Sequence, residues 1–231
     1  MEKTLRLTSV LSDPTRFNVY QYIVEHHKEV TVSEIAKEFN IHPNVARLHL
    51  SKLEDVYLLQ SYTQKTGKGG RPSRLYCLSD QVIELNFPHR DYKLLSTLAI
   101  DTLVGLGDIG KKALYETGYN YGLKVMERYH TPATTELNMD ECLQILSDAG
   151  RMLGMYPSFT YDEKSHVVHF TVNNCPFKEV AAKNHEIVCE MHHSFFQGIF
   201  ESLFTDIELI TGNTMFSGCE NCSYTAKISN I

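Results

Sequence analysis

The first 80 residues follow an order of helices and strands that very few folds accommodate. Asp13 and Pro14 form an N-cap and a first helical position, and apolar residues recur at helical spacing from 17 to 24. The segment Thr31-Val-Ser-Glu34 is a capping box, which opens a short helix ending near Phe39. The pattern therefore predicts two core-facing helices in succession.

A third helix is expected from about Pro43 to Asp55, after a tight turn at residues 40–41. Two short helices around such a turn are typical of a helix-turn-helix. At ~1.5 Å per residue the third helix spans roughly 20 Å, and the major groove of B-DNA, ~12 Å wide, admits it. Its expected buried residues are Val45, Leu48, Leu50 and Leu53. The residues expected to be exposed, near bases or phosphates, are Asn44, Arg47, His49, Ser51 and Lys52.

The following segment predicts a β-hairpin with a basic, glycine-rich tip. Its strands are expected at 57–63 and 74–79, around a tip at 64–73. Glycines let a backbone approach a phosphate closely, and lysine and arginine supply positive charge. A basic turn alone is common on protein surfaces, but directly after a helix-turn-helix it indicates the wing of a winged helix. The residues expected to contact DNA here are Lys65, Lys68, Arg71 and Arg74.

The distribution of charge agrees with this prediction, although the net charge of the chain is −6. Residues 1–90 hold 12 Lys+Arg against 10 Asp+Glu, whereas residues 91–231 hold 10 against 18. Phosphate binding depends on local positive charge. We therefore expect double-stranded DNA as a partner of the amino-terminal part only.

Two apolar helical segments follow within residues 91–130. A helix pair after a winged helix commonly forms a dimer interface, and a two-fold dimer reads a two-fold operator. We expect a homodimer, the alternative being two helices that only cover their own core. The segment Gly105-Leu-Gly-Asp-Ile-Gly110 has the glycine spacing of a dinucleotide-binding loop, but a helix precedes it where that loop needs a strand. It is expected to be a break between helices, and no nucleotide cofactor is expected.

The carboxy-terminal part combines helices and strands with four of the chain's six cysteines. Helices are expected at 139–153 and 186–204, and strands at 156–162, 166–172, 206–211 and 223–228. Cys175 directly follows the second strand and precedes Pro176, so it is expected to cap a helix, whose amino terminus would lower the thiol pKa. Cys77 and Cys142 are isolated and expected to be structural.

The remaining cysteines have the spacing of metal ligands. Cys189 is expected beside a core stripe of its helix, and either His192 or His193, one helical turn later, could share its face. Cys219 and Cys222 are separated by two residues, so one loop offers two sulfurs to the same centre. Clustered cysteines in a cytosolic protein typically hold metal or perform redox chemistry, although free cysteines are also often simply buried.

Several short words of the sequence resemble the SufR-type iron–sulfur transcriptional regulators, which have an ArsR/DeoR-like helix-turn-helix. They are Leu11-Ser-Asp-Pro-Thr-Arg16, Gly70-Arg-Pro72, Tyr76-Cys-Leu-Ser79, Asn174-Cys-Pro-Phe177, Cys189-Glu190 and Cys222-Ser-Tyr224. The resemblance implies a dimeric repressor of cluster-assembly genes with an oxygen-labile cluster, [4Fe-4S] or [2Fe-2S], held by carboxy-terminal cysteines. Cys175, Cys189 and Cys222 match its ligands, while Cys219 matches less closely. Tyr57 departs from the family where a glycine usually follows the recognition helix.

Together these observations predict an α+β chain of three parts: a winged helix-turn-helix at 1–88, a helical dimerisation region at 89–135 and an α/β sensor domain at 136–231. We expect a non-enzymatic, cytoplasmic regulator without a membrane segment, controlled by a cluster on Cys175, Cys189, Cys219 and Cys222. A structural zinc ion at the same residues is one alternative. A thiol oxidoreductase using Cys219 and Cys222, or a disulfide switch without metal, are the others.

Overall fold

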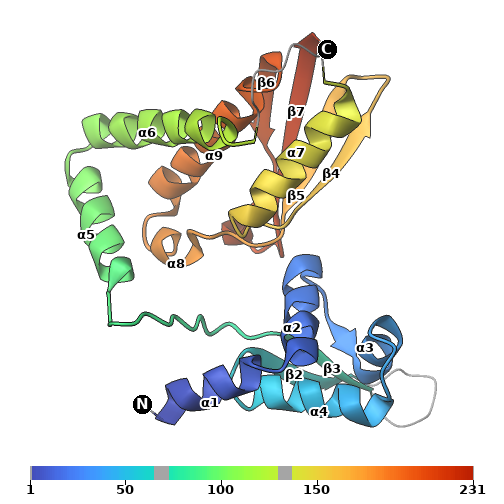
Figure 1. Ribbon diagram of the computed structural model, residues 1–231. Coiled ribbons are helices and arrows are strands. Elements are labelled where there is room, and N and C mark those ends of the chain that lie inside the picture. Colours follow the sequence, from blue (N-terminus) through green and yellow to red (C-terminus); the bar gives the residue numbers. More distant parts are fainter. Residues whose placement is uncertain (1, 65–72, 130–136, 231) are drawn as a thin grey trace. The chain divides into compact units, whose positions relative to one another are not determined.

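The computed structural model describes residues 2–64, 73–129 and 137–230, and it divides the chain into two compact units, Met1–Arg90 and Asp91–Ile231 (Figure 1). Each unit has a core of its own. The hairpin residues Lys65, Lys68 and Arg71 lie outside the described residues. None of the helices in the described ranges is long and apolar enough to span a membrane.

The first unit begins with helices α1 (Glu2–Leu11) and α2 (Pro14–His26), followed by α3 (Val32–Glu38) and α4 (Pro43–Glu54). Asp13 caps α2 by accepting the backbone N–H of Arg16 at 2.9 Å, and Thr31 and Glu34 form the predicted capping box of α3. The predicted helix starts are thus confirmed. Helix α1 has no counterpart in the sequence prediction, and it buries Leu7 and Val10.

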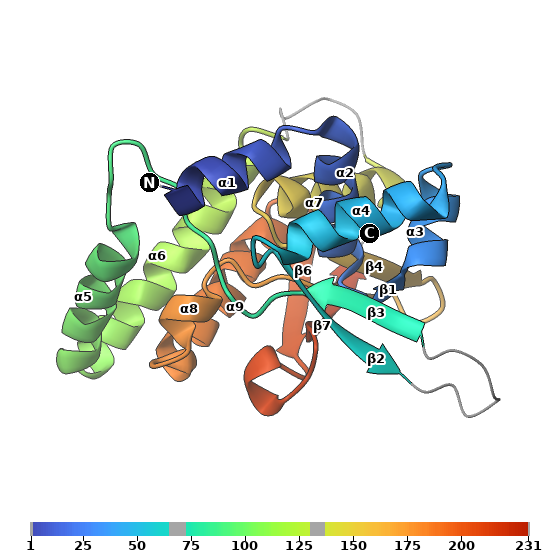
Figure 2. The same ribbon diagram turned by 90° about the horizontal axis from the view of Figure 1, so that it is seen from below.

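A three-stranded antiparallel sheet completes the first unit. Its strands are β1 (Val30–Thr31), β2 (Leu59–Gln64) and β3 (Ser73–Leu78), in the order β1-β3-β2. Strands β2 and β3 form the expected hairpin, as Figure 2 shows. Leu59 and Tyr76 of this sheet lie in one core with Ile23, Ile35 and Leu50 of the helices.

The second unit contains a four-stranded antiparallel sheet of order β4-β5-β7-β6. The strands are β4 (Pro157–Asp162), β5 (Val167–Val172), β6 (Thr205–Thr211) and β7 (Cys222–Asn230). The predicted alternation places Val168, Phe170 and Val172 on the buried face. On β7 their register partners Ala226, Tyr224 and Cys222 are also buried. The α+β class expected from the sequence is confirmed.

Helices α7 (Met139–Met152) and α9 (His185–Glu201) share one hydrophobic core with the buried face of this sheet. The Phe170 ring lies 5.4 Å from Phe196 and 5.1 Å from Phe200, both on α9. The short helix α8 (Lys178–Ala181) precedes α9.

Helices α5 (Tyr92–Gly105) and α6 (Asp108–Met126) also belong to the second unit. The Gly105–Gly107 segment separates them, as expected for a break between helices. Helix α6 lies beside α9 in both views (Figures 1 and 2). Their backbones are in close contact at two glycines. A Cβ atom at Gly122 would lie 2.2 Å from the backbone oxygen of Phe195, and one at Gly198 would lie 2.2 Å from the backbone oxygen of Tyr119.

Candidate functional site

The candidate DNA interface is built around helix α4. The His42 side chain caps this helix by accepting the backbone N–H of Asn44 at 3.2 Å, and Pro43 occupies its first turn. The Arg47 guanidinium donates to the Asn44 side-chain oxygen at 3.3 Å, and both residues are exposed. Lys52 is exposed and Ser51 half-buried. These side chains can reach a nucleic acid at the surface of the first unit.

The structure corrects three expectations about this helix. His49 was expected to be exposed, but only 8% of it is accessible because it faces inward with Ala46, Leu50 and Leu53. Burial lowers the His49 pKa. Val45 and Leu48 were expected to be buried, but they are 41% and 55% exposed. The outward face of α4 therefore carries two apolar side chains among its polar ones.

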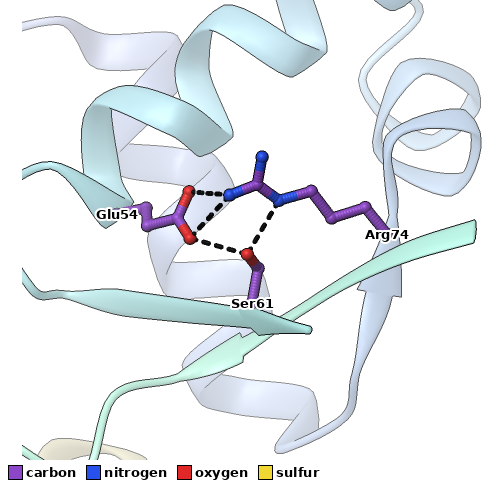
Figure 3. A network of polar contacts seen from close by, with 3 residues as sticks. All are labelled: Glu54, Ser61 and Arg74. Carbon is purple, nitrogen blue, oxygen red and sulfur yellow. Dashed lines mark hydrogen bonds and ion pairs between the residues drawn. The ribbon is translucent and has the colours of Figure 1, made fainter. Parts of the chain in front are cut away.

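Arg74, expected to contact DNA, is engaged within the fold. Its Nη2 atom lies 2.9 and 2.8 Å from the two carboxylate oxygens of Glu54, and its Nε donates to Ser61 Oγ at 2.8 Å (Figure 3). The Ser61 hydroxyl also donates to Glu54, at 2.6 Å. This network joins the last turn of α4 to both strands of the hairpin. The hydrogen bonds that Arg74 donates to the Glu54 carboxylate raise the Arg74 pKa, so the guanidinium stays charged.

Tyr57 connects α4 to the hairpin in a left-handed conformation, with φ of +62°. Its backbone N–H donates to the backbone carbonyl oxygen of Glu54 at 2.9 Å, as at a helix end that is closed by a left-handed residue. This is the position at which the sequence departs from the SufR-type pattern by lacking a glycine. The chain adopts the backbone turn without the residue that favours it.

The cysteine site begins where β5 and β7 pair. These strands are antiparallel and Val172, the last residue of β5, is the register partner of Cys222, the first residue of β7. Cys175 follows Val172 by three residues, so both cysteines belong to the same end of the sheet. Both are buried.

Helix α9 adds a third cysteine. Cys175, Cys189 and Cys222 line one cavity of about 340 Å³ together with Tyr224 and His192. The three thiols come from a loop, a helix and a strand, and tertiary structure brings them together. Tyr224 was missed by the sequence prediction, although its place two residues after Cys222 puts it on the same face of β7.

Burial is the largest influence on the pKa of these three thiols. It raises the pKa of Cys175 to about 11, and neighbouring Cys222 and Cys189 contribute to that shift. Burial also raises the pKa of Cys189 and of Cys222. The expected lowering at Cys175 is wrong, because α8 begins only at Lys178 and Cys175 does not cap it.

Two backbone groups favour thiolates in spite of this burial. The N–H of Phe177 acts on Cys175 and lowers its pKa, and the N–H of Met215 donates to Cys222 Sγ at 3.4 Å. Hydrogen bonds from backbone N–H groups to sulfur stabilise its charged form. They also surround the ligand sulfurs of iron–sulfur clusters and tune their potentials.

No three His, Cys, Asp or Glu side chains in residues 2–64, 73–129 and 137–230 are grouped as ligands of one metal ion. A tetrahedral zinc site with Zn–S bonds of about 2.3 Å needs sulfurs about 3.8 Å apart. In an iron–sulfur cluster the cysteines bind different iron atoms, so their sulfurs lie farther apart.

The other three cysteines are not among the described residues that line this cavity. Cys219 is not among the described residues that line it, and its sulfur is 3.9 Å from the Ser217 hydroxyl. It still lies close enough to Cys222 to raise that residue's pKa. Cys142 is buried in the core of the second unit, and Cys77 is half-buried on β3. The structure thus places three of the four predicted ligands together.

Comparisons with known proteins match two parts of the chain. Residues 11–61 match a helix-turn-helix domain family, and residues 120–227 match the family described as methanogen output domain 1. A search of curated proteins found no match.

Two solved structures show limited similarity. One is a trafficking protein particle complex subunit 3 from Naegleria fowleri covalently bound to palmitic acid, with 13% identity and a TM-score of 0.39 over 60% of this chain and 97% of that one. The other is the phenol-responsive sensory domain of the transcription activator PoxR with phenol, with 16% identity and a TM-score of 0.44 over 79% and 89%. Both scores are too low to assign a fold.

The helix-turn-helix match covers α2, α3 and α4. These helices occur in the predicted order, and α2 and α3 have the predicted caps. The chain is a transcription regulator that binds DNA through this amino-terminal domain, and its carboxy-terminal α/β domain resembles a methanogen output domain.

Proposed function

We propose that the regulator is a homodimeric repressor whose affinity for a two-fold operator is controlled by an iron–sulfur cluster in the cavity lined by Cys175, Cys189 and Cys222. The observation that carries this proposal is the meeting of three thiols from separate elements in one cavity of about 340 Å³. When bound, such a cluster supplies a centre that is oxidised or lost in air. Cytoplasmic thiols remain reduced and available for ligation.

Ligation at these cysteines would stiffen the sensor domain. It would join the loop after β5, helix α9 and the start of β7, which line the same cavity. Helix α9 is in backbone contact with α6 at Gly122 and Gly198, so a shift of α9 must move α6. Helix α6 is in turn in backbone contact with α5, since a Cβ atom at Gly110 would lie 1.9 Å from the Leu103 backbone oxygen, so the signal would reach the helix that we assign to the dimer.

The dimer interface is assigned to helix α5. No residue of α5 is buried, and Leu94, Leu95 and Leu98 are 54%, 63% and 57% exposed on one side of it. Its other side packs against the domain through Ile100 and Leu103, which contact a small core cluster containing Ile187 and Val188. An exposed apolar surface of this kind typically marks a protein contact. A second copy of the chain fits it, because two-fold operators require two recognition helices.

The DNA contact is assigned to the outward face of α4. Asn44 and Arg47 can hydrogen-bond to base edges, and Lys52 lies near phosphates. The exposed Val45 and Leu48 are suited to the methyl groups of thymine, which are the apolar feature of the major groove. Replacing one contacted thymine by uracil should weaken wild-type binding and leave binding by Leu48→Ala unchanged; an equal loss in both proteins contradicts this assignment.

Iron, acid-labile sulfide and zinc per chain, measured after purification without oxygen, test the cofactor. Iron with matching sulfide in the wild type, lost in Cys189→Ser but kept in Cys77→Ser, is the expected result. Stoichiometric zinc without sulfide would contradict the cluster and favour the structural-zinc alternative. A wild type without iron, sulfide or zinc would leave a thiol switch or simply buried cysteines.

A further inference from the structure

One residue that lines the cavity has a buried side-chain nitrogen without a hydrogen-bond partner among the described residues. His192 lines the cavity with Cys175, Cys189 and Cys222, and only 4% of it is accessible. Its Nε2 atom is fully buried and has no hydrogen-bond partner among the described residues. Leaving a buried polar atom unsatisfied costs about 1–3 kcal/mol. Such an atom, on a residue that lines a cavity together with three thiols, points to a bound group at this site.

The position of His192 on α9 suits a ligand. It follows Cys189 by three residues, so the two side chains lie on neighbouring positions of one helix face. The imidazole is fixed by aromatic rings, with its centroid 5.1 Å from that of Phe177 and 4.5 Å from that of Phe196. Rings that pack around it leave no polar partner for Nε2.

The protonation state of His192 agrees with this role. Burial lowers its pKa to about 3, with the nearby His193 adding to the shift. The imidazole is therefore neutral and one ring nitrogen retains the lone pair that a metal needs.

We propose that His192 is the fourth protein ligand of the metal centre, which makes the ligand set Cys175, Cys189, Cys222 and His192. This inference rests on the proposed cluster function and assigns its fourth ligand to a residue other than Cys219. Cys219 is not among the described residues lining the cavity, whereas His192 is. Imidazole replaces thiolate on iron in some clusters, and it raises their reduction potential.

His193 provides a matched control. It is the next residue of α9 and also lines the cavity, but its Nε2 is already paired with the Leu209 carbonyl oxygen at 3.1 Å. A variant at this position perturbs the same helix and removes an imidazole that has a partner.

The test compares His192→Leu, His193→Leu and Cys219→Ser, all purified without oxygen, by iron and sulfide content. We expect His192→Leu to lose at least about tenfold in cluster affinity, while the other two variants keep their clusters. His192→Cys should retain the cluster at a lower potential. Pulsed electron paramagnetic resonance of the reduced wild type should detect nitrogen coupling to the iron spins, and His192→Cys should remove it.

The outcomes separate this inference from the proposed function. If the wild type holds iron and sulfide, and these are kept in His192→Leu but lost in Cys219→Ser, only the role of His192 is overturned and the proposed function stands. A cluster without nitrogen coupling does the same. A wild type that holds no iron contradicts the proposed function, and the assignment of His192 as a cluster ligand fails with it. The His192→Cys variant also keeps the test valid if His192→Leu does not fold.

Discussion

Glu54, in the last turn of α4, holds Arg74 of β3 through both of its carboxylate oxygens, at 2.9 and 2.8 Å. The pair fixes the recognition helix to the hairpin that follows it. A residue that looks like a DNA contact in the sequence thus has a structural partner.

Arg74→Ala should lower the free energy of unfolding by about 1 kcal/mol, because it removes the guanidinium from the Glu54 carboxylate, which keeps the Ser61 hydroxyl as a donor. It should not change how DNA binding depends on salt. Lys52→Ala, the matched control, should leave stability nearly unchanged and reduce the salt slope by about 0.9, because exposed Lys52 is assigned to a phosphate. Denaturation and binding titrations at several salt concentrations distinguish the two roles. A smaller salt slope for Arg74→Ala would show that it contacts DNA.

Tyr57→Gly should stabilise the chain by about 0.5–1 kcal/mol. Tyr57 has a φ of +62° and is 60% exposed, so glycine relieves backbone strain at little loss of packing. Tyr57→Ala keeps the Cβ atom and serves as the control, with no gain expected. Chemical denaturation measures both changes. Equal effects of alanine and glycine would show that the side chain, not the backbone, decides stability here.

The pH dependence of stability should contain a contribution from His49. Burial lowers its pKa in the folded chain, partly opposed by the Asp13 carboxylate and assisted by Arg16. Between the folded value and the unfolded value of about 6.5, the unfolded chain binds more protons. Stability should therefore be full above that unfolded value and fall as the pH drops below it. The decline between pH 7.5 and 5.5 should be shallower in His49→Gln, and an unchanged profile would contradict the assignment.

Leu95→Glu should convert the dimer to monomers. Leu95 is 63% exposed on the apolar side of α5, and a carboxylate there would be buried in the interface without a partner. Lys93→Glu lies on a different side of the same helix and should leave the dimer intact. Light scattering coupled to size-exclusion chromatography reads out the mass. A Leu95→Glu protein that remains dimeric would place the interface elsewhere.

Local sequence signals predicted the local structure well. The caps at Asp13 and Thr31 and the break at Gly105–Gly107 depend on neighbouring residues only, and the structure contains all three. Exposure on α4 was mispredicted because apolar periodicity does not distinguish a face that packs from one kept free for a partner. Val45 and Leu48 are exposed, and we assign them to the face that is kept free for DNA.

The cysteine site required information that local patterns lack. Cys175 and Cys222 meet because Val172 pairs with Cys222, and this register is a long-range property of the sheet. The spacing of Cys219 and Cys222 suggested a shared centre, yet the sheet takes Cys222 into the cavity, whereas Cys219 is not among the described residues lining it. The spacing of Cys189 and His192 carried the signal for the imidazole, but only the burial of Nε2 distinguishes it from His193.

The central claim is that the state of the cysteine site sets the affinity for DNA. The direct test first selects duplexes from a random library, once with protein purified without oxygen and once with the same protein after exposure to air. Affinities of both forms for the selected duplex, measured at one salt concentration with iron and sulfide determined in the same samples, should differ by at least about fivefold. Cys189→Ser should bind like the air-exposed form in both conditions. Equal affinities of the cluster-loaded and cluster-free wild type would contradict the account.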